Sequence, residues 1–217
     1  MATTVASVAA LVPRMRAMSA GREERAALTI RERLVSTAIE FTVKRGWSKL
    51  TMSALADKVG VSRQTVYNEL GSKRQLAEAM VMEELGVFLH HVDGAFVDNP
   101  DDLVAAIEEA ARRALQMART SPLLHAVLST SQGAESDLLP LLTTHSAPVL
   151  GVAGDMIRAH VTHYDIDLAD ERVESLIDLV VRLVISYVMQ PDGTPEETAA
   201  DIGWIAARVL RPATVSR

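Results

Sequence analysis

The amino-acid sequence predicts an all-α protein. Apolar residues make up 48% of its 217 residues, which is enough to bury a core. Along most of the chain they recur at the three- and four-residue spacing of a helix, and no segment alternates with the two-residue period of a strand between hairpin turns. Glycines, prolines and short polar clusters divide this pattern into about nine helices.

The composition argues against several classes of protein. Cysteine is absent, so the chain has no disulfide, thiolate metal site or cysteine nucleophile, as expected in a reducing cytosol. The arginines near the N-terminus follow a short apolar run instead of preceding it, which is the wrong order for a secretory signal. No uninterrupted apolar stretch reaches eighteen residues. We therefore expect a soluble, cytoplasmic protein that does not cross a membrane.

The charge is divided unevenly along the chain. Residues 1–75 carry thirteen Lys and Arg against six acidic residues, a net +7, whereas residues 76–217 carry a net −13. Such asymmetry suggests a polyanionic partner for the first segment. The alternative interpretation is a solvated surface that happens to be uneven.

The N-terminal part is expected to contain an arm and one helix. Residues 1–25 are small and polar with scattered arginines, and we interpret them as a flexible basic arm. From Thr29 the chain has a helical pattern that ends at Gly46, with Trp47 packing against that end. The apolar stripe of this helix consists of Ile30, Leu34, Ala38, Phe41 and Val43.

Two short helices and the start of a long one come next. Thr51 is expected to cap a helix that ends at Gly60, since glycine readily takes a positive φ. Ser62 caps the following helix, Gly71 ends it, and Ser72 caps the long helix. Further helices are expected over residues 73–97, 102–119, 121–129, 137–164 (divided by its two prolines), 169–190 and 195–210.

The segment from Thr51 to Leu70 has the spacing of a helix-turn-helix. Ala56 is the small residue that the crossing of two helices requires, and Gly60 allows the turn. Val66 and Leu70 would hold the second helix against the first, while its polar side chains face outward. In such motifs the second helix enters the major groove of DNA, and its N-terminal residues face the base edges.

The stretch TMSALADKVGVSRQTVYNELGSKRQL resembles the DNA-binding segment of the TetR family of bacterial one-component regulators. The matching residues are Thr51, Leu55, Ala56, Gly60, Val61, Ser62, Thr65, Val66, Tyr67, Ser72, Lys73 and Leu76. The chain departs from the family pattern at Gln64 and at Glu69-Leu70, so the family's base preference does not carry over. The resemblance implies a DNA-binding domain over residues 26–75 and a helical effector-binding and dimerisation domain over residues 76–217.

The expected DNA contacts divide by chemistry. Hydroxyl and ammonium groups would bind phosphates, whereas arginine and amide side chains would read guanine or adenine edges. The candidates are Thr51, Ser62, Arg63, Gln64, Thr65, Tyr67, Asn68 and Lys73. The partner would be a palindromic or pseudo-palindromic double-stranded operator, because two copies of such a motif bind two half-sites.

Dimerisation is expected at the C-terminal end of the chain. Residues 173–188 are apolar almost all round, which is more than a helix that packs on one side needs. Together with residues 195–210 they could form half of an intermolecular four-helix bundle, so we expect a homodimer through residues 169–210. The resemblance implies the same dimer, and a helix buried within one subunit is the alternative.

The resemblance also implies a central cavity for an effector. Apolar side chains would line it, with histidine as a polar anchor, and this suits a small hydrophobic or lipid-like ligand. Simple core packing is the alternative for most of them. The candidates are Leu85, Phe88, Leu89, Val92, Ile107, Met117, Val152, Met156 and His160.

Metal binding and catalysis are not expected. His160 and His163 lie three residues apart near acidic residues, but the spacing fixes no third ligand. No nucleophile elbow or glycine-rich phosphate loop occurs, so we expect neither a cofactor nor an enzyme. The sequence predicts a repressor that a hydrophobic ligand releases from its operator. A ligand-independent architectural DNA-binding protein, or an enzyme that uses the C-terminal helices, are the alternatives.

Overall fold

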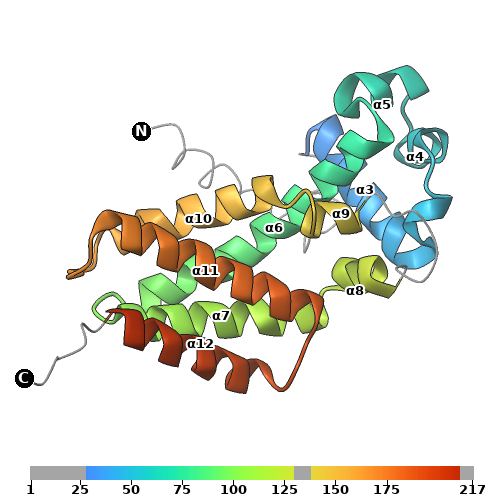
Figure 1. Cartoon of the computed structure of the whole chain (residues 1–217). Coiled ribbons are helices and arrows are strands. Elements are labelled where there is room, and N and C mark those ends of the chain that lie inside the picture. The colour runs from blue at the N-terminus through green and yellow to red at the C-terminus, as the bar shows by residue number, and fades with distance from the viewer. Residues whose placement is uncertain (1–27, 130–137, 211–217) are drawn as a thin grey trace, which may run out of the picture. The chain divides into compact units, whose positions relative to one another are not determined.

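The computed structural model describes residues 28–129 and 138–210, and the expected arm over residues 1–25 lies outside them. The described part is helical throughout and contains no strand, which confirms the all-α prediction. Its elements are α3 (Ile30–Arg45), the 3-10 turn η1 (Trp47–Lys49), α4 (Met52–Val59), α5 (Arg63–Leu70), α6 (Lys73–Asp98), α7 (Leu103–Thr120), α8 (Pro122–Ser129), α9 (Leu139–Leu142), α10 (Ala147–Val161), α11 (Asp170–Met189) and α12 (Pro195–Leu210) (Figure 1).

The chain forms two compact units. Among the described residues, the first comprises 28–87, 121–129 and 138–146, and the second comprises 88–120 and 147–210. The boundary therefore lies inside α6, and the division into functional domains at residues 75 and 76 remains a prediction. None of the described helices has the length and hydropathy that crossing a bilayer requires.

Side-chain caps begin the helices of the first unit at the expected residues. Thr51 Oγ1 accepts a hydrogen bond from the Ala54 amide at 3.1 Å, and Ser62 Oγ accepts one from the Thr65 amide at 3.0 Å. Ser72 Oγ accepts one from the amide of Gln75, whose side-chain oxygen accepts one from the Ser72 amide, so the two form a capping box. These caps fix where each helix begins.

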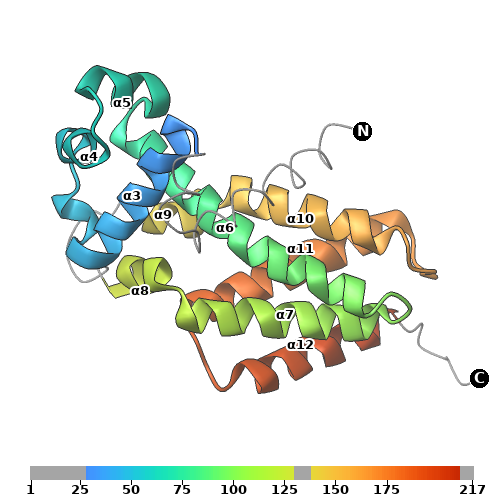
Figure 2. The ribbon, with the colours of Figure 1, turned by 180° about the vertical axis from the view of Figure 1, so that it is seen from behind.

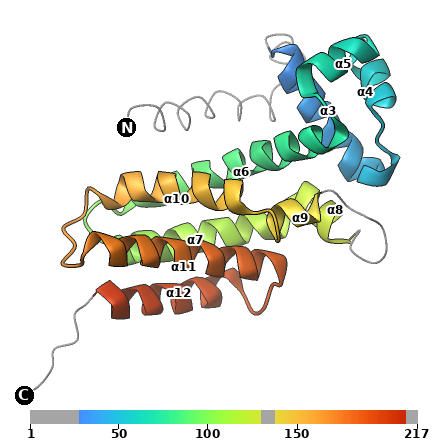
Figure 3. The ribbon, with the colours of Figure 1, turned by 45° about the horizontal axis from the view of Figure 1, so that its top comes forward.

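The core of the first unit lies where α3 meets α4 and α5 (Figure 3). Leu34, Leu55 and Val66 are fully buried, and Trp47 packs as expected with 3% of its surface exposed. The stripe of α3 is narrower than the sequence suggested, because Ile30 and Val43 in its end turns are 39% and 38% exposed.

The second unit is a bundle in which α7 packs against α11 and α12, and α11 packs against α10 (Figures 1 and 2). Small residues on α7 and α12 let the two backbones approach closely. They are Ala106, Ala110, Ala114, Ala199, Gly203 and Ala206, all of them buried. Pro148 stands in the first turn of α10, where its missing N–H costs no helical hydrogen bond.

Candidate DNA-binding site

Helices α4 and α5 form a helix-turn-helix with a rigid base. Gly60 ends α4 in the left-handed conformation, with φ 77°, and its amide donates to the Ala56 carbonyl at 2.9 Å. Ala56 is only 1% exposed, as expected for a residue at a close helix crossing. Val66 and Leu70 are buried beneath α5 at 0% and 3% exposure. The recognition helix is therefore held from below by apolar packing.

The opposite side of α5 presents polar side chains to solvent. Arg63, Gln64, Tyr67 and Asn68 are exposed, Tyr67 by 52%. Gln64 Nε2 donates to Asn68 Oδ1 at 2.8 Å, one helical turn away. This bond orients the two amides while the Gln64 oxygen and the Asn68 amino group keep their capacity to bind a partner.

The hydroxyl candidates serve first as structural groups. Thr51 and Ser62 each accept an amide hydrogen as helix caps, and the Thr51 hydroxyl retains its own hydrogen to donate. Ser62 Oγ and Thr65 Oγ1 lie 2.8 Å apart and share a hydrogen bond, which engages one of their two hydroxyl hydrogens. The three hydroxyls consequently stand at the N-termini of α4 and α5, where free amide groups and the helix dipole favour an anion.

Lys73 does not simply extend into solvent. Its Nζ donates to the Trp47 carbonyl at 3.2 Å and lies 4.6 Å from the centre of the Trp47 ring. The ammonium group is thus held at the end of α3 and the start of α6, next to the helix-turn-helix. A phosphate contact by Lys73 remains a prediction and would add to these contacts.

Two arginines of α3, which the sequence pattern did not mark as functional, fix the motif in place. Arg33 Nη2 donates to the Val59 carbonyl at the end of α4, at 3.0 Å, and Arg31 donates to the Glu69 carbonyl near the end of α5. The last carbonyls of a helix lack intrahelical partners, so both contacts satisfy groups that need donors. The available signal was a pair of arginines at the start of the preceding helix.

The predicted effector residues lie on α6, α7 and α10 with different degrees of burial. Leu89, Val92, Ile107 and Met156 are buried, whereas Phe88, Met117 and Val152 are half-buried. Leu85, also half-buried, belongs to the first compact unit. Their role in ligand binding remains a prediction.

His160 is a structural partner within the second unit. Its Nε2 lies 2.7 Å from Asp93 Oδ1, and its ring stacks on Phe96 with the centroids 4.8 Å apart. Nearby, the Tyr164 hydroxyl donates to the Asn99 carbonyl at 2.8 Å. Among the described residues no group of three or more His, Asp or Glu side chains is placed to hold a metal ion.

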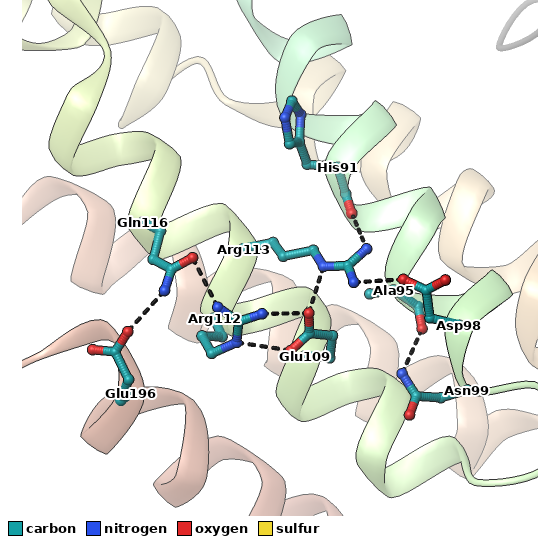
Figure 4. Close-up of polar contacts among 9 residues, drawn as sticks. All are labelled: His91, Ala95, Asp98, Asn99, Glu109, Arg112, Arg113, Gln116 and Glu196. Atoms are coloured by element: carbon teal, nitrogen blue, oxygen red, sulfur yellow. Dashed lines mark hydrogen bonds and ion pairs between the residues drawn. The ribbon is translucent and has the colours of Figure 1, made fainter.

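A polar network ties α6, α7 and α12 together (Figure 4). Arg113 binds the carboxylates of Asp98 and Glu109, both at 2.6 Å, and Arg112 also binds Glu109. The hydrogen bonds from Arg112 hold the pKa of Glu109 below its usual value. Gln116 carries the network to Glu196 on α12 at 2.7 Å. These contacts hold the last helix of the bundle against α7.

Helices α11 and α12 bury one side and expose another. Leu176, Ile177, Val180 and Val181 are buried within the subunit. A second apolar set remains in contact with solvent: Leu179 is 58% exposed, Trp204 61%, Ile205 39% and Val209 42%. The buried side packs within the subunit, as the alternative to the dimer required, and a role of the exposed apolar side chains in dimerisation remains a prediction.

Comparison with known proteins shows what the chain resembles. A model described as bacterial regulatory proteins of the tetR family matches residues 34–80, and one for the C-terminal domain of the bacterial tetracyclin repressor matches residues 102–208. The two matches together span more than two thirds of the chain. The HTH-type transcriptional regulator AlkX of Mycobacterium tuberculosis is 29% identical over 183 residues, which is 84% of each protein.

Solved structures share the fold. The TetR family repressor AlkX from a Dietzia strain, implicated in biodegradation of n-alkanes, is similar with a TM-score of 0.69 at 23% identity, over 88% of this chain and 97% of that one. The repressor QsdR of R. erythropolis is similar with a TM-score of 0.54 at 18% identity, over 83% and 93% of the two chains.

Proposed function

Because the chain belongs to the TetR family of bacterial transcriptional regulators, we propose that it is a repressor released from its operator by a small hydrophobic ligand. The observation that supports DNA binding most directly is the exposed polar face of α5 on its buried apolar base. The family consists of regulators that bind DNA and not of enzymes, which argues against the alternative of catalysis by the C-terminal helices.

The proposed contacts follow the chemistry of each side chain. Arg63, Gln64 and Asn68 are exposed on the first two turns of α5, where a recognition helix meets base edges. Thr51, Ser62, Thr65, Tyr67 and Lys73 would donate to phosphates on either side. Phosphate contacts position the helix and base contacts select the sequence.

We also propose a homodimer through residues 169–210. The apolar residues Leu179 on α11 and Trp204 on α12 are exposed, and pairing of two copies through these helices would bury them. A symmetric dimer would present two recognition helices to half-sites about 34 Å apart on one face of the duplex. The operator would accordingly be palindromic or nearly so.

The effector is proposed to be an apolar molecule. The candidate residues on α6, α7 and α10 are almost all aliphatic or aromatic, with His160 and its partner Asp93 as the polar pair. The relative from Dietzia is implicated in biodegradation of n-alkanes, which favours an alkane-like compound. Such a ligand can release DNA only if it binds the DNA-free protein more tightly than it binds the protein on its operator.

The experiment begins with selection of an operator from a random-sequence DNA library, followed by fluorescence-anisotropy titrations. Tyr67→Ala and Lys73→Ala should weaken binding to all sequences, and the lysine change should also reduce the salt dependence. Arg63→Ala and Gln64→Ala should instead relax preference at single base pairs by about 1–3 kcal/mol. Arg119→Ala, an exposed arginine on α7 outside the proposed DNA-binding and dimer surfaces, is the matched control. Unchanged operator affinity in all four variants would refute the assignment.

A further inference from the structure

The first unit contains an acidic groove in an otherwise basic part of the chain. The groove has a volume of about 530 Å³ and is formed by residues of α3, α5 and α6. Its lining includes the carboxylates of Glu32, Glu69, Glu78 and Glu83 and the guanidinium of Arg31. Glu78 also pairs with Arg74 at 3.3 Å, and Glu32 accepts hydrogen bonds from Thr29, so the carboxylates still outnumber the neighbouring guanidinium groups by four to two. Val35, Leu70 and Met82 supply apolar surface. A ligand that fits this chemistry is both cationic and partly apolar.

We propose that this groove binds the chain's own N-terminal segment LVPRMRAM, residues 11–18. The segment has two arginines, no acidic residue, and Leu11, Val12, Met15 and Met18 interspersed with them. Its charges are complementary to the glutamates, and its apolar side chains suit Val35 and Met82. The arm residues nearer α3 are a poorer match, because Arg22 and Arg25 flank Glu23 and Glu24.

The covalent connection allows this contact. The described chain begins at Leu28, two residues before α3, and the first turn of α3 supplies Arg31 and Glu32 to the groove. Thirteen residue-to-residue steps lead from Arg16 to Thr29, and an extended chain of that length spans up to about 43–47 Å. A segment tethered in this way has an effective concentration of the order of millimolar, so weak contacts suffice.

The occupied groove regulates DNA binding, a consequence that rests on the proposed function. Tyr67 and Asn68 line the groove and also belong to the proposed DNA-binding face of α5. A segment placed there hinders the approach of a duplex to these side chains, and its arginines pair with glutamates instead of phosphates. The arm therefore acts as an intramolecular competitor that lowers affinity for DNA.

Disulfide cross-linking tests the docking without DNA. The chain has no cysteine, so the pair Met15→Cys and Met82→Cys reports only the designed contact. The docked segment would bring residue 15 next to residue 82. Under mild oxidation the pair should then form an intramolecular disulfide, which requires Cβ atoms about 4 Å apart. The control pair Met15→Cys and Asp57→Cys places the second thiol at an exposed position on α4 outside the groove. It should cross-link at least tenfold more slowly.

Three results would refute the docking. They are equal rates for the two pairs, a disulfide that links two copies of the chain, and a rate that does not fall when Arg14 and Arg16 are both changed to Gln. None depends on whether the protein binds DNA, so failure here is distinguishable from failure of the proposed function.

DNA binding then tests the competition. Glu69→Gln with Glu78→Gln should raise operator affinity of the full chain several-fold more than that of a chain lacking residues 1–20. A purely electrostatic effect of the lost charges would raise both equally, and that result would refute the competition. Glu40→Gln with Asp57→Asn makes the same charge change on exposed side chains of the first unit outside the groove, and should show no dependence on the arm.

Discussion

Truncation of Trp204 tests the proposed dimer most directly. The indole is 61% exposed on α12, with the Arg208 guanidinium carbon 5.3 Å from its ring centre. An aromatic side chain buries about 150–250 Å² in total, so about 90–150 Å² would remain for a partner to cover. At about 25 cal/mol per Å² this corresponds to about 2–4 kcal/mol per subunit.

A two-fold symmetric interface counts this contribution twice. The upper bound is then about 4–8 kcal/mol, or about three to six powers of ten in the dimer dissociation constant. The actual loss should be smaller than this bound, because alanine retains some contact and part of the indole ring stays exposed in the dimer. We therefore expect Trp204→Ala to weaken the dimer at least ~100-fold. Leu179→Ala, at a side chain that is 58% exposed, should weaken it less.

The assay is sedimentation velocity with fluorescence detection over a concentration series that brackets the wild-type dissociation constant. Val97→Ala is the matched control, because Val97 is 64% exposed but lies on α6. Operator affinity should fall in parallel with dimerisation, since one recognition helix alone holds only a half-site. A monomeric wild-type protein, an unchanged constant in Trp204→Ala, or equal weakening by Val97→Ala would refute the reasoning.

Three further predictions concern the helix-turn-helix, the half-buried carboxyl group of Glu84 and the ligand. Arg33→Met removes the donor to the Val59 carbonyl and should lower the free energy of unfolding by about 1–2 kcal/mol in urea titrations, whereas Arg172→Met at an exposed position should not. Burial raises the pKa of Glu84 above its usual value, so the folded state favours the protonated form; its contribution to stability is present at low pH and lost as the pH rises through the folded-state pKa. Glu84→Gln should therefore flatten the pH dependence of unfolding above pH ~4.5, and an unchanged profile would contradict this. Phe88→Ala should leave dimerisation and DNA binding intact while altering the release of DNA by hydrophobic ligands. If the variant failed to bind the operator even without ligand, Phe88 would not be a ligand contact alone.

The helices of this protein could be predicted because their limits depend on local chemistry. Thr51, Ser62 and Ser72 each interact with a residue three positions later, a distance that the sequence displays directly. Gly60 and Gly71 stand where the backbone takes a positive φ. Such signals involve only a few neighbouring residues, so tertiary packing did not override them.

The contacts that hold the site could not be predicted, because they join distant parts of the chain. Arg33 meets a carbonyl 26 residues away, and Arg31 meets one 38 residues away. Lys73 was correctly placed at the start of a helix, but its contact with Trp47 depends on how α3 ends beside α6. An arginine or lysine in the sequence indicates a donor without indicating which acceptor the fold will bring to it.

The points at which the chain crosses between its two compact units bear on how a ligand could affect DNA binding. The chain passes between its two compact units at Val87–Phe88, Thr120–Ser121 and Ser146–Ala147. The first of these junctions lies inside α6, where bending would break helical hydrogen bonds, whereas the other two fall at the end of α7 and at the start of α10. Phe88 is the predicted ligand contact that stands at the first junction.

The second junction is fastened to that same helix. Ser121 Oγ accepts the Leu124 amide at 3.1 Å as the cap of α8 and donates to the carboxyl group of Glu84. Glu84 precedes Phe88 by four residues, so the two side chains lie on the same face of α6. The Glu84–Ser121 bond therefore joins the N-terminus of α8 to α6 within the first unit, one helical turn before Phe88. A ligand that contacts Phe88 can shift an equilibrium of α6 only if it binds two arrangements of that helix unequally.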